Sequence, residues 1–387
     1  MVLRSHRADL RTGSAWEGTR RGTLILAICV ALGAGCALRT NSHTARQRYE
    51  KKELQSLLTR FEQPGLVLGE FALASKPVID GDTVKVAGLE TTLRLLAIDT
   101  EETFKNEDDR RFAAADWEGY LAFKASQSRK PIKVATPMGE EAKRFAQKFF
   151  QGVTKVRLER DHPKDLRGRF NRYLVYVFAM KDGVWVNYNI ACVRAGMSPY
   201  FTKYGYSRRF HADFLRAQEL ARSEARGIWD PNTQHYPDYD ARLEWWNARG
   251  EFVAGFEDEG RDKEDWVVLT HWDSLLRLEE LEGRDVHVLG TVSEVKLGDR
   301  GPTKVLLGRR MFSDFPLIFF DKDVFGSSRI ADYRGEFVHV KGQVTRYRNK
   351  HNGEETLQIQ VKSPSQILLS VRPPPASPSN TATASTP

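Results

Sequence analysis

The chain has 387 residues, of which 41% are hydrophobic and 28% charged, so its composition is that of a globular protein rather than a disordered one. Its length allows two or three domains, and its three cysteines are too few for a disulfide framework or a cysteine-based zinc site. The net charge of +8 suits a polyanionic partner, although many basic proteins have none.

The N-terminal segment has the pattern of an export signal. Arg20 and Arg21 precede the apolar run GTLILAICVALGAGCAL, which is short for a membrane span. Small residues before Cys36 resemble a lipoprotein cleavage site, and an uncleaved membrane anchor is the alternative. Residues 1–36 therefore predict an exported protein, held in the cell envelope by lipid or anchor, or secreted. Residues 37–65 begin with polar residues and continue with apolar residues at helical spacing, so they predict a stalk.

The first compact region, residues 66–230, alternates strands and helices. Strands are predicted at FALASKPVIDGDTVKVAG and TTLRLLAIDT, then at TKVRLERD and RYLVYVFAMKDGVWV, with a turn at Lys181–Gly183. Helices are predicted at GEEAKRFAQKFF, at 187–195 and at about 207–226, and Cys192 is expected to pack as a small apolar residue. This order predicts a small barrel with helices packed on it, an α+β fold.

The segment 231–280 is a predicted connector made of helices and one short strand at WVVLT. It holds Trp245, Trp246, Trp266 and Trp272, half of the tryptophans of the chain. Their rings could stack on nucleic-acid bases, and the alternative is that they pack two domains together.

The second compact region, residues 281–370, contains an internal echo. GRDVHVLGTV matches GEFVHVKGQV, and the predicted order of three strands, a helix near Ile330 and two strands is that of an OB-fold. Such barrels commonly bind single-stranded nucleic acid, and a purely structural barrel is the alternative. VTRYRNK, at residues 344–350, predicts a loop with a tyrosine among basic residues, and the Pro/Ser/Thr-rich tail, 371–387, is predicted to be disordered.

Three carboxylates of the first region suit a metal ion. Asp80 and Asp82 are two residues apart, so on a strand they would share a face, and Asp99 is expected at the end of the neighbouring strand. Carboxylates with a main-chain carbonyl and water suit a hard cation such as calcium, and no nearby histidine or cysteine favours zinc.

The same strand carries an arginine among apolar residues. Arg94 could form a structural ion pair, or its guanidinium could hold a phosphate oxygen. LRGRFNRYLVYV offers further arginines, of which Arg172 directly precedes a predicted strand. Glu101 and Glu102 follow the acid at position 99 and are both candidates to activate water, and strand parity does not decide between them.

Six motifs together resemble the staphylococcal nuclease, or thermonuclease, family: VIDGDTVKV, LRLLAIDTEET, RGRFNRYLVYV, DGVWVN, VRAG and GIW. The resemblance spans about residues 73–229 in consistent order. It implies an OB-type barrel with three helices, and hence two barrels in this chain: a mainly β, α+β fold with a helical connector between them.

The resemblance also implies roles for individual residues. Asp82 and Asp99 match the carboxylates that bind calcium, Thr100 matches the residue that contributes its carbonyl, and Asp80 matches a nearby acid that does not bind the metal. Because calcium is the family's ion, Ca²⁺ is the expected cofactor.

For catalysis, the resemblance assigns Glu102 as the general base. Arg94 and Arg172 match the two arginines that hold the phosphate and stabilise transition-state charge.

Departures from the family pattern concern the turn and one loop. Glu101 stands where the family has proline, and it is expected to loosen the turn that aims Glu102 and to add charge beside the site. Gly168 replaces an aspartate, and Asn171 replaces a glycine whose backbone conformation asparagine tolerates. Residues 104–137 are longer than the family loop, and FAAADWEGYLAF within them predicts a helix that gates substrate or a surface insertion.

The sequence therefore predicts a calcium-dependent endonuclease that hydrolyses DNA or RNA without sugar specificity. Nucleic acid, with single-stranded regions preferred, and a membrane are the expected partners, and no obligate protein partner is expected. The alternatives are an inactive nuclease-like domain that binds nucleic acid, and an envelope scaffold. The presence of all five acids and arginines assigned to calcium binding and catalysis favours the enzyme.

Overall fold

A computed structural model describes residues 65–128, 131–168, 170–309, 313–350 and 353–375. The predicted export signal, almost all of the predicted stalk and most of the predicted disordered tail lie outside these residues. Within them, no helix combines the length and the apolar character needed to cross a membrane.

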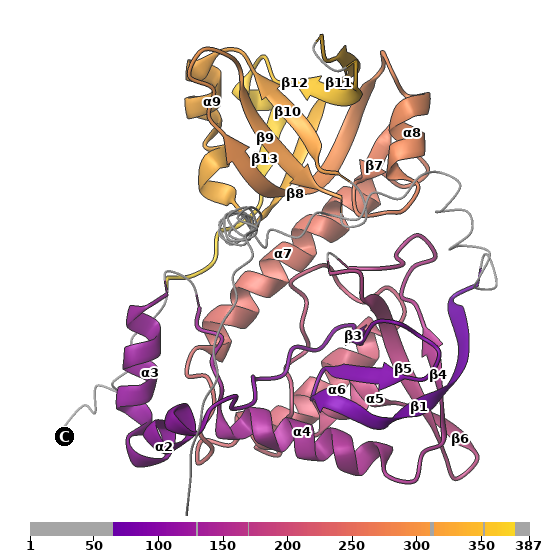
Figure 1. The fold of residues 1–387 in the computed structure, drawn as a ribbon, viewed down its shortest axis with the longest axis vertical. Helices are drawn as coiled ribbons and strands as arrows, with labels where there is room; N and C mark the ends of the chain where they lie inside the picture. Colours follow the sequence, from indigo (N-terminus) through magenta and orange to yellow (C-terminus); the bar gives the residue numbers. More distant parts are fainter. Residues whose placement is uncertain (1–64, 129–130, 169, 310–312, 351–352, 376–387) are drawn as a thin grey trace, which may run out of the picture. The chain divides into compact units, whose positions relative to one another are not determined.

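The first barrel closes from five strands in the order β1-β2-β3-β5-β4, with β4 returning to β1 (Figure 1). Strand β3 is parallel to β5 and the other neighbours are antiparallel. This is OB-fold topology, with helix α4 between the third and fourth strands. A sixth strand extends from β5. The bounds are β1 (Val67–Asp80), β2 (Thr83–Val86), β3 (Leu93–Leu95), α4 (Pro137–Phe150), β4 (Lys155–Glu159), β5 (Tyr173–Lys181) and β6 (Val184–Asn187).

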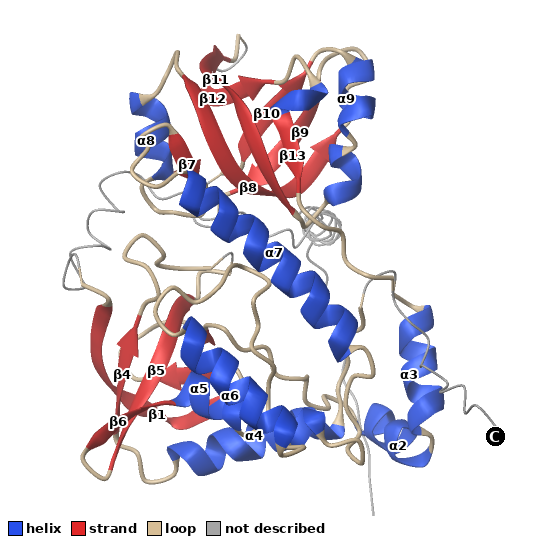
Figure 2. Cartoon of the chain, turned by 180° about the vertical axis from the view of Figure 1, so that it is seen from behind, coloured by secondary structure: helices blue, strands red, loops and turns tan. Residues whose placement is uncertain are grey.

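Helices cover this barrel and form an additional lobe (Figure 2). The predicted 104–137 insertion folds into α2 (Glu107–Ala115) and α3 (Trp117–Ser126), two helices where one was predicted. Helix α5 (Tyr188–Arg194) carries the free, buried Cys192, which packs in the barrel core as predicted. Helix α6 (His211–Ser223) begins a few residues later than predicted, and a short 3-10 helix (Gly227–Trp229) follows it.

The second barrel repeats the topology of the first. Its strands follow the order β8-β9-β10-β12-β11, β11 closes on β8, and β10 is parallel to β12. The internal echo of the sequence corresponds to β8 and β11, which lie side by side. The elements are β7 (Trp266–Val268), β8 (Asp285–Lys296), β9 (Thr303–Gly308), β10 (Phe315–Phe319), α9 (Lys322–Ser328), a 3-10 helix (Ile330–Tyr333), β11 (Phe337–Arg348), β12 (Glu355–Gln360), a 3-10 helix (Pro364–Gln366) and β13 (Ile367–Leu369).

The predicted basic loop of the second barrel is largely a strand. Arg346, Tyr347 and Arg348 are the last residues of β11, whose alternating side chains point to opposite faces. Arg346 is also paired with Glu282 at 2.6 Å and with Glu355 at 3.4 Å. Tyr347 remains about half exposed.

The predicted connector is built into both barrels. It consists of helix α7 (Tyr239–Glu259), strand β7 and helix α8 (Ser274–Glu280), and β7 pairs with β8 of the second sheet. Trp245, Trp246 and Trp266 are all buried, so these rings pack domains together and are not available to stack on bases.

Candidate active site

Two acids meet at the hairpin turn that joins β1 to β2. Asp80 ends β1, and Gly81 and Asp82 form the turn, where the Asp82 amide donates to an Asp80 carboxylate oxygen at 3.1 Å. The prediction that the two acids share a strand face was therefore wrong. An aspartate-capped turn brings them together instead.

The turn packs closely on the segment that carries the third acid. A Cβ on Gly81 would lie 2.7 Å from the Thr100 side chain, so only glycine fits there. The Gly81 carbonyl accepts a hydrogen bond at 2.7 Å from the hydroxyl of Tyr188, which is fully buried. The barrel interior thus fixes the turn.

Asp99 follows an irregular segment rather than the end of a strand. Strand β3 ends at Leu95, four residues before Asp99, and Ala97 has a left-handed backbone with φ 61°, which is uncommon for a residue other than glycine. The Asp99 amide then donates to the Ser198 hydroxyl at 2.9 Å. Asp99 is positioned by this turn and by the loop after α5.

Arg94 bridges the two acids. It is the middle residue of β3, between buried Leu93 and Leu95, and its guanidinium leaves the core on the opposite face. One nitrogen contacts a carboxylate oxygen of Asp82, and the other donates to Asp99 at 2.6 Å. Two carboxylates that share one guanidinium converge on a small volume.

Lys133, from the end of the insertion, also binds Asp99. Its ammonium lies 2.8 Å and 2.7 Å from the two carboxylate oxygens. Burial alone would raise the pKa of Asp99, but Lys133 and Arg94 outweigh this effect and lower it to about 2. No described residue supplies such a cation to Asp80, and burial together with Asp82 raises its pKa to about 6. The cluster thus contains one strongly ionised acid beside one that holds its proton more tightly.

The oxygen atoms of the cluster fit a hard cation. Asp82 and Asp99 are buried and face each other across Arg94, and the cluster has no histidine or cysteine. Thr100 is also buried, and no described residue donates a hydrogen bond to its carbonyl. A buried carbonyl without a donor beside carboxylates is a suitable ligand for calcium.

Glu102 lies beside this cluster on the wall of a cavity. The cavity has a volume of about 480 Å³, and the insertion provides most of its lining, including Lys105, Lys124 and Lys133. The carboxylate of Glu102 is half-buried and has no hydrogen-bond partner among the described residues. It is therefore available to a ligand in the cavity.

The backbone of Glu102 is held by the start of helix α4. The Glu102 carbonyl accepts from the Thr136 amide at 3.0 Å, and a Cβ on Gly139 would lie 2.0 Å from that carbonyl oxygen. Only a glycine lets the first turn of α4 approach so closely.

Glu101 does not act as a loose charge beside the site, and that expectation was wrong. It is 1% exposed, and its oxygens accept from the Thr136 hydroxyl, from the Tyr236 amide at 2.7 Å and from the Tyr239 hydroxyl at 2.8 Å. Burial raises the pKa of this carboxyl. Glu101 therefore ties the turn before Glu102 to the start of the connector.

The start of the connector also holds the end of the insertion. The Tyr236 hydroxyl donates to the Val134 carbonyl at 2.7 Å and accepts from the Val134 amide at 3.1 Å. The buried Arg242 donates to the Ile132 carbonyl at 2.6 Å. Lys133 lies between these two anchored residues, so the same segment fixes both sides of the cavity.

The second predicted phosphate arginine, Arg172, lies just before β5. Arg94 pairs with Leu174 across the parallel strands β3 and β5, so Arg172 directly precedes the strand that neighbours Arg94. Its guanidinium has no ion-pair partner among the described residues, whereas Arg167 is buried and bonded to Asn171 and Tyr173. Of these two arginines, Arg172 is the one available to an anion.

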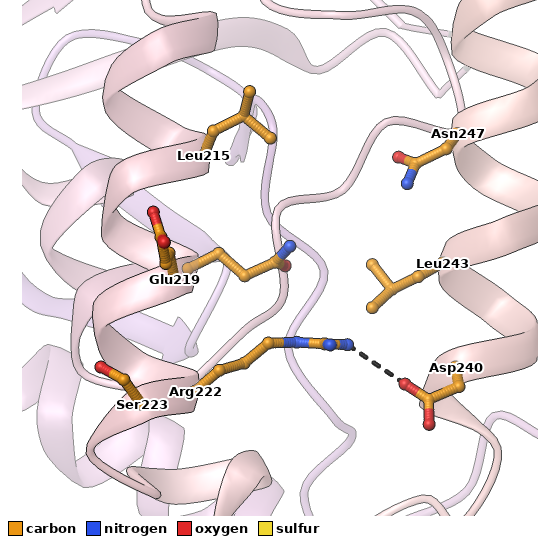
Figure 3. Close-up of a pocket in the computed structure, with 8 residues that line it drawn as sticks. Leu215, Glu219, Arg222, Ser223, Asp240, Leu243 and Asn247 are labelled. Atoms are coloured by element: carbon orange, nitrogen blue, oxygen red, sulfur yellow. Dashed lines mark hydrogen bonds and ion pairs between the residues drawn. The ribbon is translucent and has the colours of Figure 1, made fainter.

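A larger groove lies elsewhere, between helices α6 and α7. It has a volume of about 680 Å³ and is spanned by an ion pair of 3.2 Å between Arg222 and Asp240 (Figure 3). None of the predicted site residues lines it.

Sequence reasoning missed two residues of this site. Lys133 lies in the long insertion, where no motif marks it, and Glu101 was considered as a candidate base and as a departure from the family pattern, but not as a buried anchor of the turn. The apolar segment before position 101 was a signal that Glu101 would be buried. A buried carboxylate requires hydrogen-bond donors from elsewhere in the fold.

A family model matches part of this chain. Residues 92–231 match the family model described as staphylococcal nuclease homologue. The matched segment contains Arg94, Asp99, Glu102 and Arg172, and the turn with Asp82 lies just before it. A search of curated proteins gave no match.

The contact between α4 and Glu102 can be tested with a pair of glycine substitutions. Gly139→Ala should lower the free energy of unfolding by about 1–3 kcal/mol, because the added methyl group overpacks the turn. Gly255→Ala, in the interior of α7 with open space around it, should be neutral or stabilise by up to about 1 kcal/mol. Urea denaturation measures both, and equal stabilities would contradict the close approach.

The buried carboxylate can be tested by restoring the family residue. Glu101→Pro should destabilise the protein, by about 1–3 kcal/mol for each buried donor left unpaired, and should lower rather than raise any activity. Glu101→Gln keeps an acceptor for the Tyr236 amide and should be milder. A proline variant as stable as the parent in denaturant would show that these hydrogen bonds do not matter.

Proposed function

Because residues 92–231 form a staphylococcal nuclease-like domain, we propose that this protein is a calcium-dependent nuclease that hydrolyses phosphodiester bonds of DNA or RNA. One observation carries the proposal: Asp82 and Asp99 converge on Arg94 at the edge of a cavity that Glu102 and three lysines line. Hard-cation ligands, a carboxylate without a partner and cations for an anionic substrate then meet at one place.

In this proposal, Asp82, Asp99 and the Thr100 carbonyl hold the calcium ion, which supplies positive charge against the phosphate. Arg94 in β3 and Arg172, just before the neighbouring β5, supply the two guanidinium groups that would hold phosphate oxygens and stabilise the negative charge of the transition state.

Glu102 acts as the general base. Its carboxylate takes a proton from water as the water oxygen attacks phosphorus and the bond to the leaving oxygen breaks. The anchored turn supports this role, because the hydrogen bonds of Glu101 and the contact with Gly139 hold the backbone on both sides of the Glu102 side chain. A base must be held within hydrogen-bond reach of its water to be effective.

The lysine-lined cavity gives the insertion a part in substrate binding. Of its three lysines, Lys124 is paired with Asp109 and Lys133 with Asp99, which leaves Lys105 without an ion pair among the described residues and available to a phosphate of a nucleic acid. In the second barrel the half-exposed Tyr347 offers a ring for base stacking, and we propose that this barrel assists the binding of single strands.

The proposal places the enzyme outside the cytoplasm. Its support is the sequence pattern of residues 1–36, an Arg-rich start, an apolar run and small residues before Cys36. A nuclease in the cell envelope would act on nucleic acids from outside the cell.

An inactive nucleic-acid-binding domain is the second candidate, and the contacts of two cations favour it. Lys133 holds both carboxylate oxygens of Asp99, and Arg94 is paired with both Asp82 and Asp99, so each competes with a metal ion for these ligands. The two candidates separate when the purified chain, without residues 1–36, is incubated with single- and double-stranded DNA and RNA in calcium or EDTA. Cleavage in calcium alone supports the enzyme, and binding without cleavage supports the alternative.

The general base can be separated from the metal ligands. Glu102→Gln should reduce the cleavage rate by about 10²–10⁴-fold, because the amide cannot accept the proton, while calorimetry shows nearly unchanged calcium binding. Asp99→Ala should lose both, because a hard oxygen ligand is removed. Full activity of Glu102→Gln would exclude this residue as the base.

The assignment of Arg172 can be tested by keeping its charge. Arg172→Lys removes the planar guanidinium and should cost about 2–4 kcal/mol of transition-state stabilisation, visible in kcat/KM. The buried Arg167 is the comparison, because its variant should lose stability rather than transition-state binding. If Arg172→Lys retained the parent kcat/KM, another residue would have to hold the phosphate.

A further inference from the structure

We propose that His162, Asp165 and His271 form a second metal site, one that binds a divalent transition-metal ion of the zinc class and fastens the connector to the first domain. Each of the three residues offers a ligand atom, and these atoms all lie within 4.8 Å of one another. Two imidazoles and a carboxylate are ligands that zinc prefers, in contrast to the all-oxygen calcium cluster. This site is independent of the proposed nuclease activity.

The two segments that carry the ligands are already joined. The amide of Trp272 donates to the Lys164 carbonyl at 3.1 Å, and the Lys164 ammonium lies 2.6 Å from Asp273. His162 and His271 stack with ring centroids 4.7 Å apart and planes 13° from parallel. The ligands are therefore brought together by other contacts.

His271 is more than nine-tenths buried, and its Nε2 atom has no hydrogen-bond partner within the described structure. A buried polar atom without a partner is rare in folded proteins, and an ion is one of its explanations. Burial lowers the pKa of His271 to about 3 and also lowers that of His162, so both rings are neutral, the form that binds metals.

The surrounding charges favour a cation. Arg208 faces three carboxylates, Asp161 at 3.8 Å, Asp165 at 3.7 Å and Glu257 in closer contact. The neighbouring ion pair between Lys164 and Asp273 has no net charge. With Arg160 also near Asp165, four acids face three bases around the cluster, and a divalent ion would offset the excess negative charge.

Binding requires only a local adjustment. Zinc–nitrogen distances of about 2.0–2.1 Å require ligand atoms closer together than 4.8 Å, which rotations of the side chains can provide. The Lys164 amide donates to Nδ1 of His162 at 3.1 Å, so binding through Nε2 would keep this hydrogen bond and binding through Nδ1 would replace it. Water would complete the four-coordinate shell.

The test uses the full chain without a polyhistidine tag, with calcium in excess to occupy the acidic cluster. Zn²⁺ is titrated by calorimetry, Co²⁺ is used as a probe of tetrahedral geometry through its visible absorption, and thermal unfolding is followed with and without Zn²⁺. The parent should bind about one equivalent and unfold at a higher temperature with Zn²⁺.

The variants identify the ligands. His162→Gln, at a half-buried position that tolerates change, should weaken Zn²⁺ binding at least tenfold and abolish the thermal shift, and Asp165→Asn should act in the same direction. His211→Gln, whose ring contacts Tyr200 and Tyr206 and is not one of the clustered ligands, should behave as the parent. Absent Zn²⁺ binding in the parent, or equal affinity in His162→Gln and His211→Gln, would overturn the proposal.

Discussion

Buried carboxylates that need positively charged partners impose the main constraint on this fold. Asp82 and Asp99 are withdrawn from water at one end of the first barrel, where a charged group without a counter-charge is costly. Arg94, in the middle of a three-residue strand, forms ion pairs with both carboxylates, and Lys133, from the insertion, forms an ion pair with Asp99. The short β3, the left-handed Ala97 and the glycine turn before β2 all serve to bring these groups within contact.

A second buried carboxylate links this cluster to the rest of the chain. Glu101 receives three hydrogen bonds, two of them from the start of the connector, and the same segment holds the end of the insertion through Tyr236 and Arg242. Further along α7, Arg249 makes a fully buried ion pair with Glu336, next to β11. One helix therefore contacts the surroundings of the candidate site and the second barrel.

The elements could be predicted from the sequence because their signals are local. Alternation and turn residues mark the strands of both barrels, and the order of three strands, a helix and two strands is visible in the second region alone. The ends of strands are harder to predict, since the Asp80–Asp82 turn depends on the close approach of Gly81 to Thr100, a contact that sequence alone does not show. Partners distant in the chain could not be predicted: Lys133 is 34 residues from Asp99, and Tyr236 is 135 residues from Glu101.

The position of Tyr236 and Tyr239 moves the C-terminal boundary of the first domain. Both rings belong to the hydrophobic core of the first barrel, yet both lie beyond residue 231, where the family match ends. A chain cut at that boundary would leave the Glu101 carboxylate without two of its three donors. The unit that could be transferred to another protein is therefore the first barrel together with the start of α7. An exchange of the second barrel would have to preserve this helix, because both domains share it.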